Sequence, residues 1–214
     1  MAKTAFGSTI RASLAAAALA GGLAATSPAF ALDVIIGGQA ELCSKAAKAG
    51  LATNDALGWC TTAILSEPLT PKDLAGTYVN RGTLYLVRES WDQAMSDFDT
   101  ALAKMPTLAE AIVNRGAAFL GQGKYAEAVI EISRGIELNP EEPEKAYANR
   151  AAARWRMDDV KGAYVDFLKA QALNPTWDLP REQLTHFVVQ PAPIEDRVAP
   201  TNLAPPARPP APRS

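Results

Sequence analysis

The sequence of 214 residues predicts an all-α solenoid of stacked helical hairpins. The main observation is a pattern of Asn-Arg followed by a small residue, which recurs at Asn80, Asn114 and Asn149 with spacings of 34 and 35 residues. Each copy is followed at constant offsets by residues of one class, and the last of these are Pro106, Pro140 and Pro175. A fixed period of this length indicates one structural unit, and such units must stack to bury their apolar faces.

Each unit is predicted to contain two antiparallel helices. In the second helix of the first copy, apolar residues at helical spacing form one stripe, which comprises Ala94, Phe98, Ala101 and Met105. Small residues let the two backbones approach closely, and they are Gly82, Gly116 and Ala151 on the first helices and Ala94, Ala128 and Ala163 on the second. The proline after each second helix ends that helix, because proline lacks an N–H and has a fixed φ.

The small, aromatic and proline positions resemble those of the tetratricopeptide-repeat family, whose unit is a 34-residue helix-turn-helix. The resemblance implies three repeats, at about residues 75–108, 109–143 and 144–177, of an Asn-Arg-Gly subtype. Two features depart from the family pattern. Arginines stand where leucine is commoner, at Arg81, Arg115 and Arg150, and Arg154 replaces an aromatic residue.

The N-terminus has the composition of a secretory signal. Two basic residues accompany an apolar run from Leu14 to Leu23, and Ala29-Phe30-Ala31 forms a small-x-small cleavage site. We therefore expect residues 1–31 to be removed, so that the mature chain begins at Leu32. The apolar run is too short for a permanent membrane anchor. By resemblance, the signal directs the protein to a bacterial periplasm, or to secretion.

Cys43 and Cys60 are the only cysteines, and two cysteines in an oxidising compartment usually pair. They fall in a degenerate hairpin within residues 32–70, with helices predicted at 39–48 and 54–66. A disulfide would staple this hairpin and contribute roughly 3 kcal/mol in the chain-entropy model. The alternative is two buried thiols. A redox-catalytic pair is not expected, because no Cys-x-x-Cys spacing exists.

The three repeats are predicted to occupy residues 71–177. Their first helix begins after Thr70, which can cap it, with Pro71 at the first position and Asp73 in the first turn, and it extends to about residue 87.

A capping helix is predicted at residues 178–190, because a solenoid exposes its last core face unless something covers it. Its apolar face would comprise Leu184, Phe187 and Val188. Residues 191–214 contain eight prolines and no apolar periodicity, so we expect a disordered tail. That tail is inert, or is a polyproline ligand for an aromatic groove, or folds back into the protein's own groove.

The family resemblance implies that the first helices of the repeats form a concave wall that binds a protein or peptide partner. The predicted partner-binding residues are Val79, Asn80, Thr83, Leu86, Val113, Asn114, Leu120, Lys145, Asn149 and Trp155. The three asparagines would form a ladder, since an amide can pair with both groups of an extended peptide backbone. Alternatively, they are inherited from repeat duplication and merely solvated. Val79 and Val113 stand where basic residues would grip a terminal carboxylate, which argues against that partner class.

The three arginines are interpreted as structural. An acid lies sixteen residues after each one, and these acids are Asp97, Glu131 and Asp166. An antiparallel hairpin brings such positions together, so three Arg–carboxylate pairs are expected, each partly exposed and contributing up to about 1 kcal/mol. Arg115 could instead reach Asp97, and Arg150 could reach Glu131, which would tie neighbouring repeats together.

Several function classes are not expected. Removing the signal leaves 19 basic and 23 acidic residues, a net charge of −4 that offers no footprint for nucleic acid. His186 is the only histidine, so no metal cluster, cofactor site or catalytic set can be assembled, and no small-molecule substrate is implied.

The sequence thus predicts an exported, non-enzymatic interaction protein, an adaptor, scaffold or chaperone-like factor in envelope assembly. The alternative is a structural subunit that uses its convex face, edges or tail and leaves the groove without a ligand.

Overall fold

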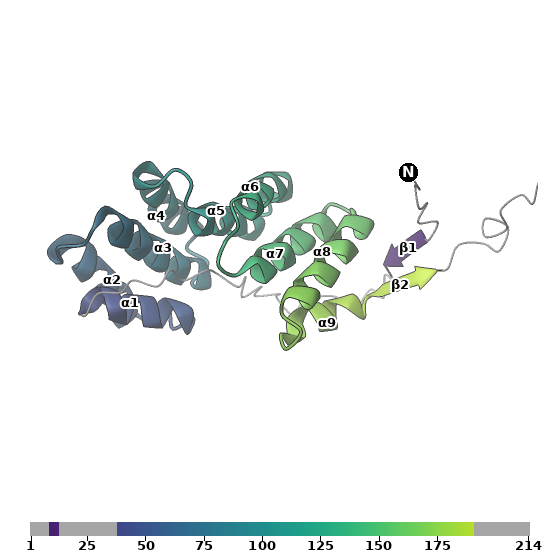
Figure 1. The fold of residues 1–214 in the computed structure, drawn as a ribbon, viewed down its shortest axis with the longest axis horizontal. Coiled ribbons are helices and arrows are strands. Elements are labelled where there is room, and N and C mark those ends of the chain that lie inside the picture. The colour runs from purple at the N-terminus through teal and green to yellow at the C-terminus, as the bar shows by residue number, and fades with distance from the viewer. Residues whose placement is uncertain (1–8, 13–37, 191–214) are drawn as a thin grey trace, which may run out of the picture.

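A computed structural model describes residues 9–12 and 38–190, and these ranges contain nine helices and two short strands (Figure 1). In chain order the elements are β1 (Thr9–Ala12), α1 (Gln39–Lys48), α2 (Asn54–Ser66), α3 (Pro71–Val87), α4 (Trp91–Lys104), α5 (Ala109–Gly121), α6 (Tyr125–Glu137), α7 (Pro143–Arg156), α8 (Val160–Leu173), α9 (Asp178–Leu184) and β2 (Phe187–Gln190). The predicted signal cleavage site and the proline-rich tail lie outside the described residues.

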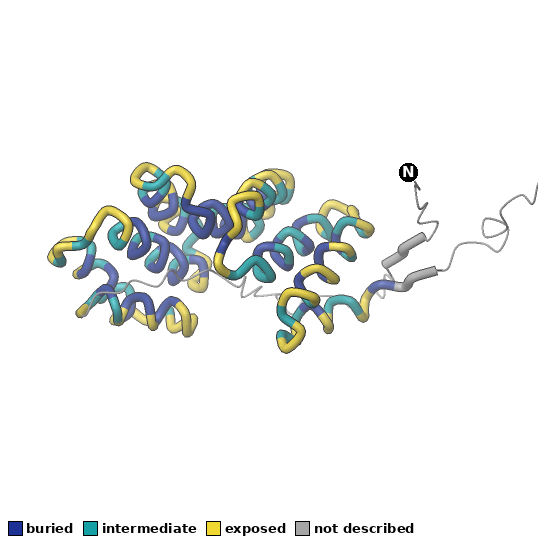
Figure 2. The backbone as a smooth tube through the Cα atoms, in the orientation of Figure 1, coloured by how far each residue is buried: buried dark blue, intermediate teal, exposed yellow. Residues whose placement is uncertain are grey.

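Consecutive helices pair as hairpins, α1 with α2 through α7 with α8, and each hairpin contacts the next. The first helices α3, α5 and α7 lie side by side, and α4 and α6 lie on their other side (Figure 1). Buried residues follow the faces on which the helices meet (Figure 2). The predicted all-α solenoid of three repeats and one additional N-terminal hairpin is confirmed.

Local signals in the sequence set the helix boundaries. Thr70 Oγ1 accepts a hydrogen bond from the Asp73 N–H at 3.2 Å, and Pro71 is the first residue of α3, as predicted. Each hairpin turn contains one residue in the left-handed region, at Gly50, Glu89, Gly123 and Asp158. Two of these four residues carry a Cβ, and there the turn costs about 1–2 kcal/mol relative to glycine.

Glycine is required where the two helices of a hairpin meet. A Cβ on Gly82 would lie 2.5 Å from Phe98 Cε1, and a Cβ on Gly116 would lie 2.5 Å from Ile132 Cγ1. No carbon pair approaches so closely, which explains the small residue in the repeated pattern. Phe98 and Ile132 are both fully buried, so each hairpin has its own core.

The N-terminal hairpin is held by a disulfide. Cys43 on α1 and Cys60 on α2 are bonded, with an S–S distance of 2.08 Å, and both are fully buried beside Leu84 of α3. The predicted pairing therefore holds, and the alternative of two buried thiols does not. Glu67 reinforces the hairpin, because its carboxylate accepts hydrogen bonds from the Gln39 and Ala40 N–H groups at the start of α1.

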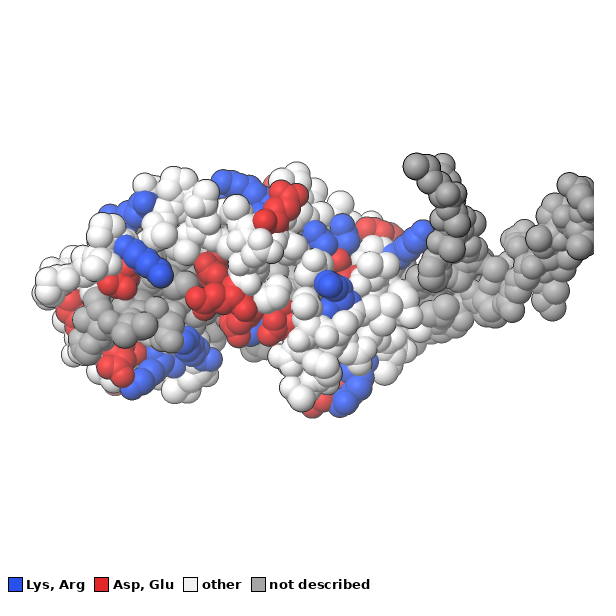
Figure 3. All heavy atoms as spheres, in the orientation of Figure 1, with Lys and Arg blue, Asp and Glu red and all other residues white. Residues whose placement is uncertain are grey.

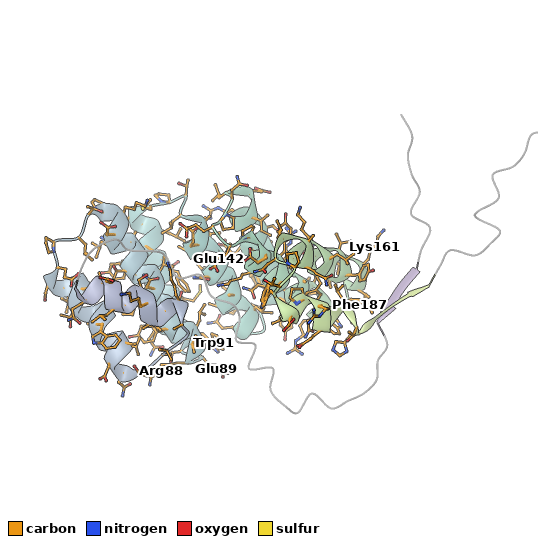
Figure 4. All side chains as sticks on the ribbon, turned by 60° about the horizontal axis from the view of Figure 1, so that its bottom comes forward. Arg88, Glu89, Trp91, Glu142, Lys161 and Phe187 are labelled. Carbon is orange, nitrogen blue, oxygen red and sulfur yellow. A yellow bond between two sulfur atoms is a disulfide. The ribbon has the colours of Figure 1, made fainter. Side chains whose placement is uncertain are left out.

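The C-terminal end differs from the prediction. The capping helix expected at 178–190 ends at Leu184, and Phe187–Gln190 forms β2, which pairs antiparallel with β1. Phe187 nevertheless covers the last core face. Its ring centroid lies 5.2 Å from that of Trp155, 5.5 Å from Tyr164 and 6.1 Å from Phe167 (Figure 4). Phe187 directly follows the turn that ends α9, and its side chain covers the end of the core, so a longer helix is not needed there.

The three repeated arginines bind the acids of their own hairpins. Arg81 donates through Nε and Nη2 to both oxygens of Asp97, at 2.9 and 2.7 Å. Arg150 makes the same fork to Asp166, with both distances 2.9 Å. Arg115 donates through Nε and Nη2 to Glu131 Oε2, at 3.1 and 2.8 Å. The predicted pairing within each hairpin is confirmed.

The remaining nitrogen of each guanidinium reaches the preceding hairpin. The Nη1 atoms of Arg81, Arg115 and Arg150 donate to Thr61 of α2 at 3.1 Å, Asp99 of α4 at 2.8 Å and Ser133 of α6 at 3.0 Å. The expected tie between repeats is therefore present, but through these residues rather than Asp97 or Glu131. Each arginine joins three helices.

These pairs are more buried than the sequence suggested, since the side chains of Asp97 and Asp166 are only 6% and 3% exposed. Burial raises the pKa of the Asp97 carboxyl above its ordinary value and outweighs the opposing effect of Arg81. The folded state thus holds this proton more tightly than the unfolded chain. The contribution of Asp97 to the free energy of unfolding is therefore fully present below the pKa that it has in the unfolded chain. It is lost as the pH rises through the pKa that it has in the folded protein. Arg81 remains charged because its hydrogen bonds to Asp97 raise its pKa.

Arg154, which stands where the family pattern has an aromatic residue, joins the same network. Its Nη1 donates to Asp166 Oδ2 at 2.8 Å, and its Nε lies 3.6 Å from Asp159 Oδ2. Asp166 is therefore shared by two guanidinium groups, and the last repeat keeps its hairpin geometry without the aromatic ring.

We expect Arg81→Met to lower the free energy of unfolding by about 3–5 kcal/mol, because it leaves the Asp97 carboxylate buried without its partner. Urea denaturation followed by circular dichroism measures the loss. The double variant R81M/D97L should be more stable than R81M, since the unpaired charge is gone. Lys45→Ala, which removes an exposed ion pair with Glu41, serves as the control and should leave stability unchanged. A similar stability for all three variants would show that the Arg81–Asp97 pair does not stabilise the fold.

Candidate functional site: the inner wall of the solenoid

The candidate site is the wall formed by α3, α5 and α7, with one asparagine of the repeated pattern on each helix. Figure 1 shows α1 and α9 at the two ends of this row, on the side away from α4 and α6, so the row is arched. The surface is hollowed between these two ends (Figure 3). The three asparagines of the repeated pattern belong to the three helices of this row.

Seven of the ten predicted partner-binding side chains are buried. The buried residues are Val79, Asn80, Thr83, Leu86, Val113, Asn114 and Asn149. Leu120, Lys145 and Trp155 are partly exposed.

The apolar members of the predicted set belong to the core. Val79 and Leu86 pack in one cluster with Phe98, so they face the second helix of their own hairpin. Val113 packs in the cluster of Ile132, and a Cβ on Gly135 would lie 2.4 Å from Val113 Cγ2. These side chains line the interface within their hairpins, and their contact with a ligand stays a prediction.

The asparagines are buried polar groups. Asn80 and Asn114 are fully buried and Asn149 is 3% exposed, and all three take part in polar interactions. Asn114 Nδ2 donates to Thr83 Oγ1 at 3.1 Å, a bond that links α5 to α3 across two repeats. The alternative that the asparagines are simply solvated is therefore also wrong. Their burial obliges them to be hydrogen-bonded, as buried amides in folded proteins generally are.

The other two polar or aromatic candidates are engaged elsewhere. Lys145 Nζ lies 2.6 Å from Glu142 Oε1. Trp155 belongs to the C-terminal aromatic cluster, with its ring centroid 5.6 Å from that of His186 and 5.2 Å from Phe187. Trp155 therefore closes the end of the solenoid.

The wall presents little free positive charge. Arg81, Arg115 and Arg150 are held by carboxylates, Lys145 is paired with Glu142, and Arg156 lies over the Tyr125 ring at 5.7 Å. Acidic side chains gather near the middle of the face drawn in Figure 3, and Glu141 and Glu142 directly precede α7. A partner with an acidic terminus would meet unfavourable electrostatics here, while an uncharged segment would not.

Two further findings on the described residues concern metal binding and membrane insertion. Between residues 38 and 190, no group of His, Cys, Asp or Glu side chains is placed to hold a metal ion. None of the helices in the part of the chain that the structure describes is long and apolar enough to cross a membrane.

Sequence reasoning missed the polar residues that receive the arginine Nη1 groups, namely Thr61, Asp99 and Ser133. They occupy equivalent places in three successive second helices, so aligning the repeats would have found a polar residue there each time. It also missed the Thr83–Asn114 bond, because the two residues belong to different repeats and differ in type.

Comparisons with known proteins agree with the helical architecture. No model of a known protein family matches the chain. Human tetratricopeptide repeat protein 13 is 35% identical over 126 residues, which are 56% of this chain and 14% of the relative. RNA polymerase II-associated protein 3 of Xenopus tropicalis is 33% identical over 94 residues, or 44% of this chain and 14% of the relative. The chain thus spans about a seventh of either relative's length.

Three solved structures show the same fold. The first TPR domain of human RPAP3 has a TM-score of 0.50 at 23% identity, covering 53% of this chain and 89% of that domain. The TPR domain of Arabidopsis OM64 has a TM-score of 0.50 at 22% identity, covering 54% and 95%. A double mutant of MamA has a TM-score of 0.51 at 20% identity, covering 69% and 82%. At these identities the likeness is one of fold.

We expect Asn114→Ala to lower the free energy of unfolding by about 1–3 kcal/mol, because the Thr83 hydroxyl loses a buried donor. Combining it with Thr83→Ala in a double-mutant cycle should give a coupling of about 0.5–3 kcal/mol between the two side chains. Gln93→Ala, which removes an exposed amide on α4, is the control and should change stability by less than about 0.5 kcal/mol. Equal effects at Asn114 and Gln93, measured by chemical denaturation, would contradict a structural role for the amide row.

Proposed function

Because the chain has the fold of a tetratricopeptide-repeat solenoid, we propose that it is a non-enzymatic protein-interaction module that binds an extended segment of a partner along its arched wall. The observation that carries the proposal is the stack itself, in which the first helices α3, α5 and α7 lie side by side and form one wall along the arch. Leu120 near the end of α5 is a partly exposed apolar side chain of this wall. One of the sequence relatives is named for its association with RNA polymerase II, which fits an interaction role.

The buried asparagines stabilise this wall and do not face the partner, since the Asn114–Thr83 bond joins α5 to α3. Because cations on the wall are already paired, the favoured partner segment is uncharged and apolar rather than an acidic tail.

The proposed location is the bacterial envelope, where the module acts as an adaptor, scaffold or chaperone-like factor in assembly. This rests on the signal-like residues 1–31 and on the buried Cys43–Cys60 disulfide, since disulfides persist in oxidising compartments.

A second candidate function is that of a structural subunit contacting a complex through its outer face. Exposed apolar side chains on the second helices favour it, namely Ile130 on α6 at 66% and Val165 and Leu168 on α8 at 52% and 41%. Such a subunit would need no ligand on the inner wall.

Export predicts a defined mature product. The protein recovered from the periplasmic fraction of its own cells should begin at Leu32, as found by N-terminal sequencing, and should react with no thiol reagent unless first reduced. The Ala31→Arg variant, in which a bulky charged residue blocks the cleavage site, is the control and should keep residues 1–31. A mature chain that retains its N-terminus would contradict export by this signal.

The two candidate functions differ in the face that meets the partner. We expect a photoreactive benzophenone side chain at position 120, in place of Leu120 near the end of α5, to crosslink the mature protein to a partner chain in its own envelope. The same probe in place of Ile130, on the outer face of the same hairpin, is the matched control and should not crosslink. Crosslinks from position 130 alone would support the structural subunit and exclude the inner wall as the binding site.

A further inference from the structure

The last second helix, α8, differs from the others on the side that faces the next hairpin. Thr61 of α2, Asp99 of α4 and Ser133 of α6 each accept a hydrogen bond from an arginine of the following hairpin. Each of them lies five residues after the small residue of its helix, and the residue at this place on α8 is Leu168. Leu168 cannot accept such a bond, and it is 41% exposed. The side of α8 on which a further hairpin would pack is therefore apolar and accessible.

Helix α9 packs on α8 but does not replace a further hairpin. It has seven residues, whereas α3, α5 and α7 have 17, 13 and 14. Arg115 and Arg150 lie nine and ten residues after the proline that follows the preceding second helix, and the same places after Pro175 hold Leu184 and Thr185. Neither carries a guanidinium group, so α9 does not bind α8 as α7 binds α6.

The exposed residues of α8 form a stripe with the spacing of a helix-pairing seam. Residues four, three and four positions apart share one face of a helix, as the a and d positions of a heptad do. Lys161, at the start of the stripe, lies at the end of the stack that holds α8 and α9 (Figure 4). On α4 the equivalent stripe is mostly polar and on α6 it holds one large apolar residue, whereas on α8 both central places are apolar. The stripes are Asp92, Ser96, Asp99 and Ala103 on α4, Ala126, Ile130, Ser133 and Glu137 on α6, and Lys161, Val165, Leu168 and Ala172 on α8.

The charge beside this stripe is positive. Lys161 and Lys169 are exposed, and neither forms an ion pair with another residue of the described ranges. Asp166, the one acid within α8, is 2% exposed and is bound by two arginines. Asp159, which directly precedes the helix, is held by Arg154. The face of α8 therefore combines an apolar strip with two lysines whose charge is not neutralised by nearby acids.

We propose that this face of α8 binds an amphipathic helix of a partner protein, whose apolar residues at heptad spacing are flanked by carboxylates. The apolar residues of the partner helix pack against Val165 and Leu168, and its carboxylates meet Lys161 and Lys169. This surface lies at the end of the stack and is separate from the inner wall, so the inference goes beyond the proposed function. The two surfaces also select different partners, because the cations of the inner wall are paired and those of α8 are not.

A second copy of the chain fits this face less well. If two α8 helices packed antiparallel about a twofold axis, Val165 of one copy would meet Leu168 of the other. Lys161 would then lie opposite Ala172 of the other copy, one helical turn from Lys169. Such a dimer would bring lysines together twice, and like charges placed side by side in an interface oppose association. A helix that carries carboxylates removes this repulsion.

The test uses the protein purified from its own cells and a fluorescein-labelled synthetic peptide. The peptide has about four heptads, with leucine at positions a and d and glutamate at e and g, which prevents it from pairing with itself. Fluorescence anisotropy should show binding that Leu168→Ser weakens by about tenfold or more. The double variant K161E/K169E should also lose this peptide and should instead bind a second peptide in which lysine replaces every glutamate. Ile130→Ser, which removes an exposed apolar side chain from α6, is the matched control and should bind as the natural protein does.

Three results would overturn the inference. The natural protein could bind the glutamate and lysine peptides equally, or Leu120→Ser or Ile130→Ser could abolish binding while Leu168→Ser does not. Sedimentation velocity could also reveal a dimer that Leu168→Ser dissociates, which would assign the face to a second copy. Circular dichroism checks that each variant is folded, as expected for substitutions of exposed side chains. None of these results affects the inner wall, whose function is tested separately by the crosslinks from position 120.

Discussion

The arrangement of the repeats depends on three guanidinium groups that each hold three helices. Arg81, Arg115 and Arg150 bind the acid of their own hairpin and a polar residue of the preceding one. A planar group with donors in fixed directions can satisfy both at once, which a lysine could not. Apolar contacts hold neighbouring hairpins together, but they restrict the rotation of one hairpin against the next only weakly. The directional hydrogen bonds of the arginines therefore fix the orientation of each hairpin relative to the preceding one.

The same groups bear on what the wall can recognise. Because the arginines are committed to Asp97, Glu131 and Asp166, their charge does not reach the arched surface, and Lys145 is paired with Glu142. The amides of Asn80, Asn114 and Asn149 are buried in the helix packing as well, so the accessible part of the wall offers partly exposed apolar side chains such as Leu120. Such a wall favours an uncharged segment over a charged terminus.

The fold was largely predictable from the sequence, because a period of 34 or 35 residues fixes the unit and each unit repeats its own boundary signals. Thr70, Pro71 and the Cys43–Cys60 pair were predictable for the same local reasons. The site was less predictable. Helical periodicity states which residues share a face, but it does not state whether that face meets the second helix of the hairpin or the solvent. The burial of Val79 and Val113 in their hairpin cores could not be predicted for this reason.

Pairing between residues far apart in the sequence was the second feature that could not be predicted. The sequence of Phe187–Gln190 is compatible with a continuation of the helix and with a strand. Only the pairing with Thr9–Ala12 distinguishes the two. Arg154 likewise could not be assigned a partner from its own repeat pattern, because its ion pair with Asp166 depends on a third residue, Arg150, sharing that carboxylate.

The β1–β2 pairing has a consequence for how the molecule forms. Every hairpin is closed by residues near in sequence, whereas Thr9 and Gln190 come from opposite extremes of the described chain. Contacts of such separation carry a large loop-closure entropy and are made late, after local structure has shortened the effective distance. Gln190 is synthesised long after Thr9, so the two strands can meet only when translation is nearly complete. A chain that has lost residues 1–31 by then can never form this pair.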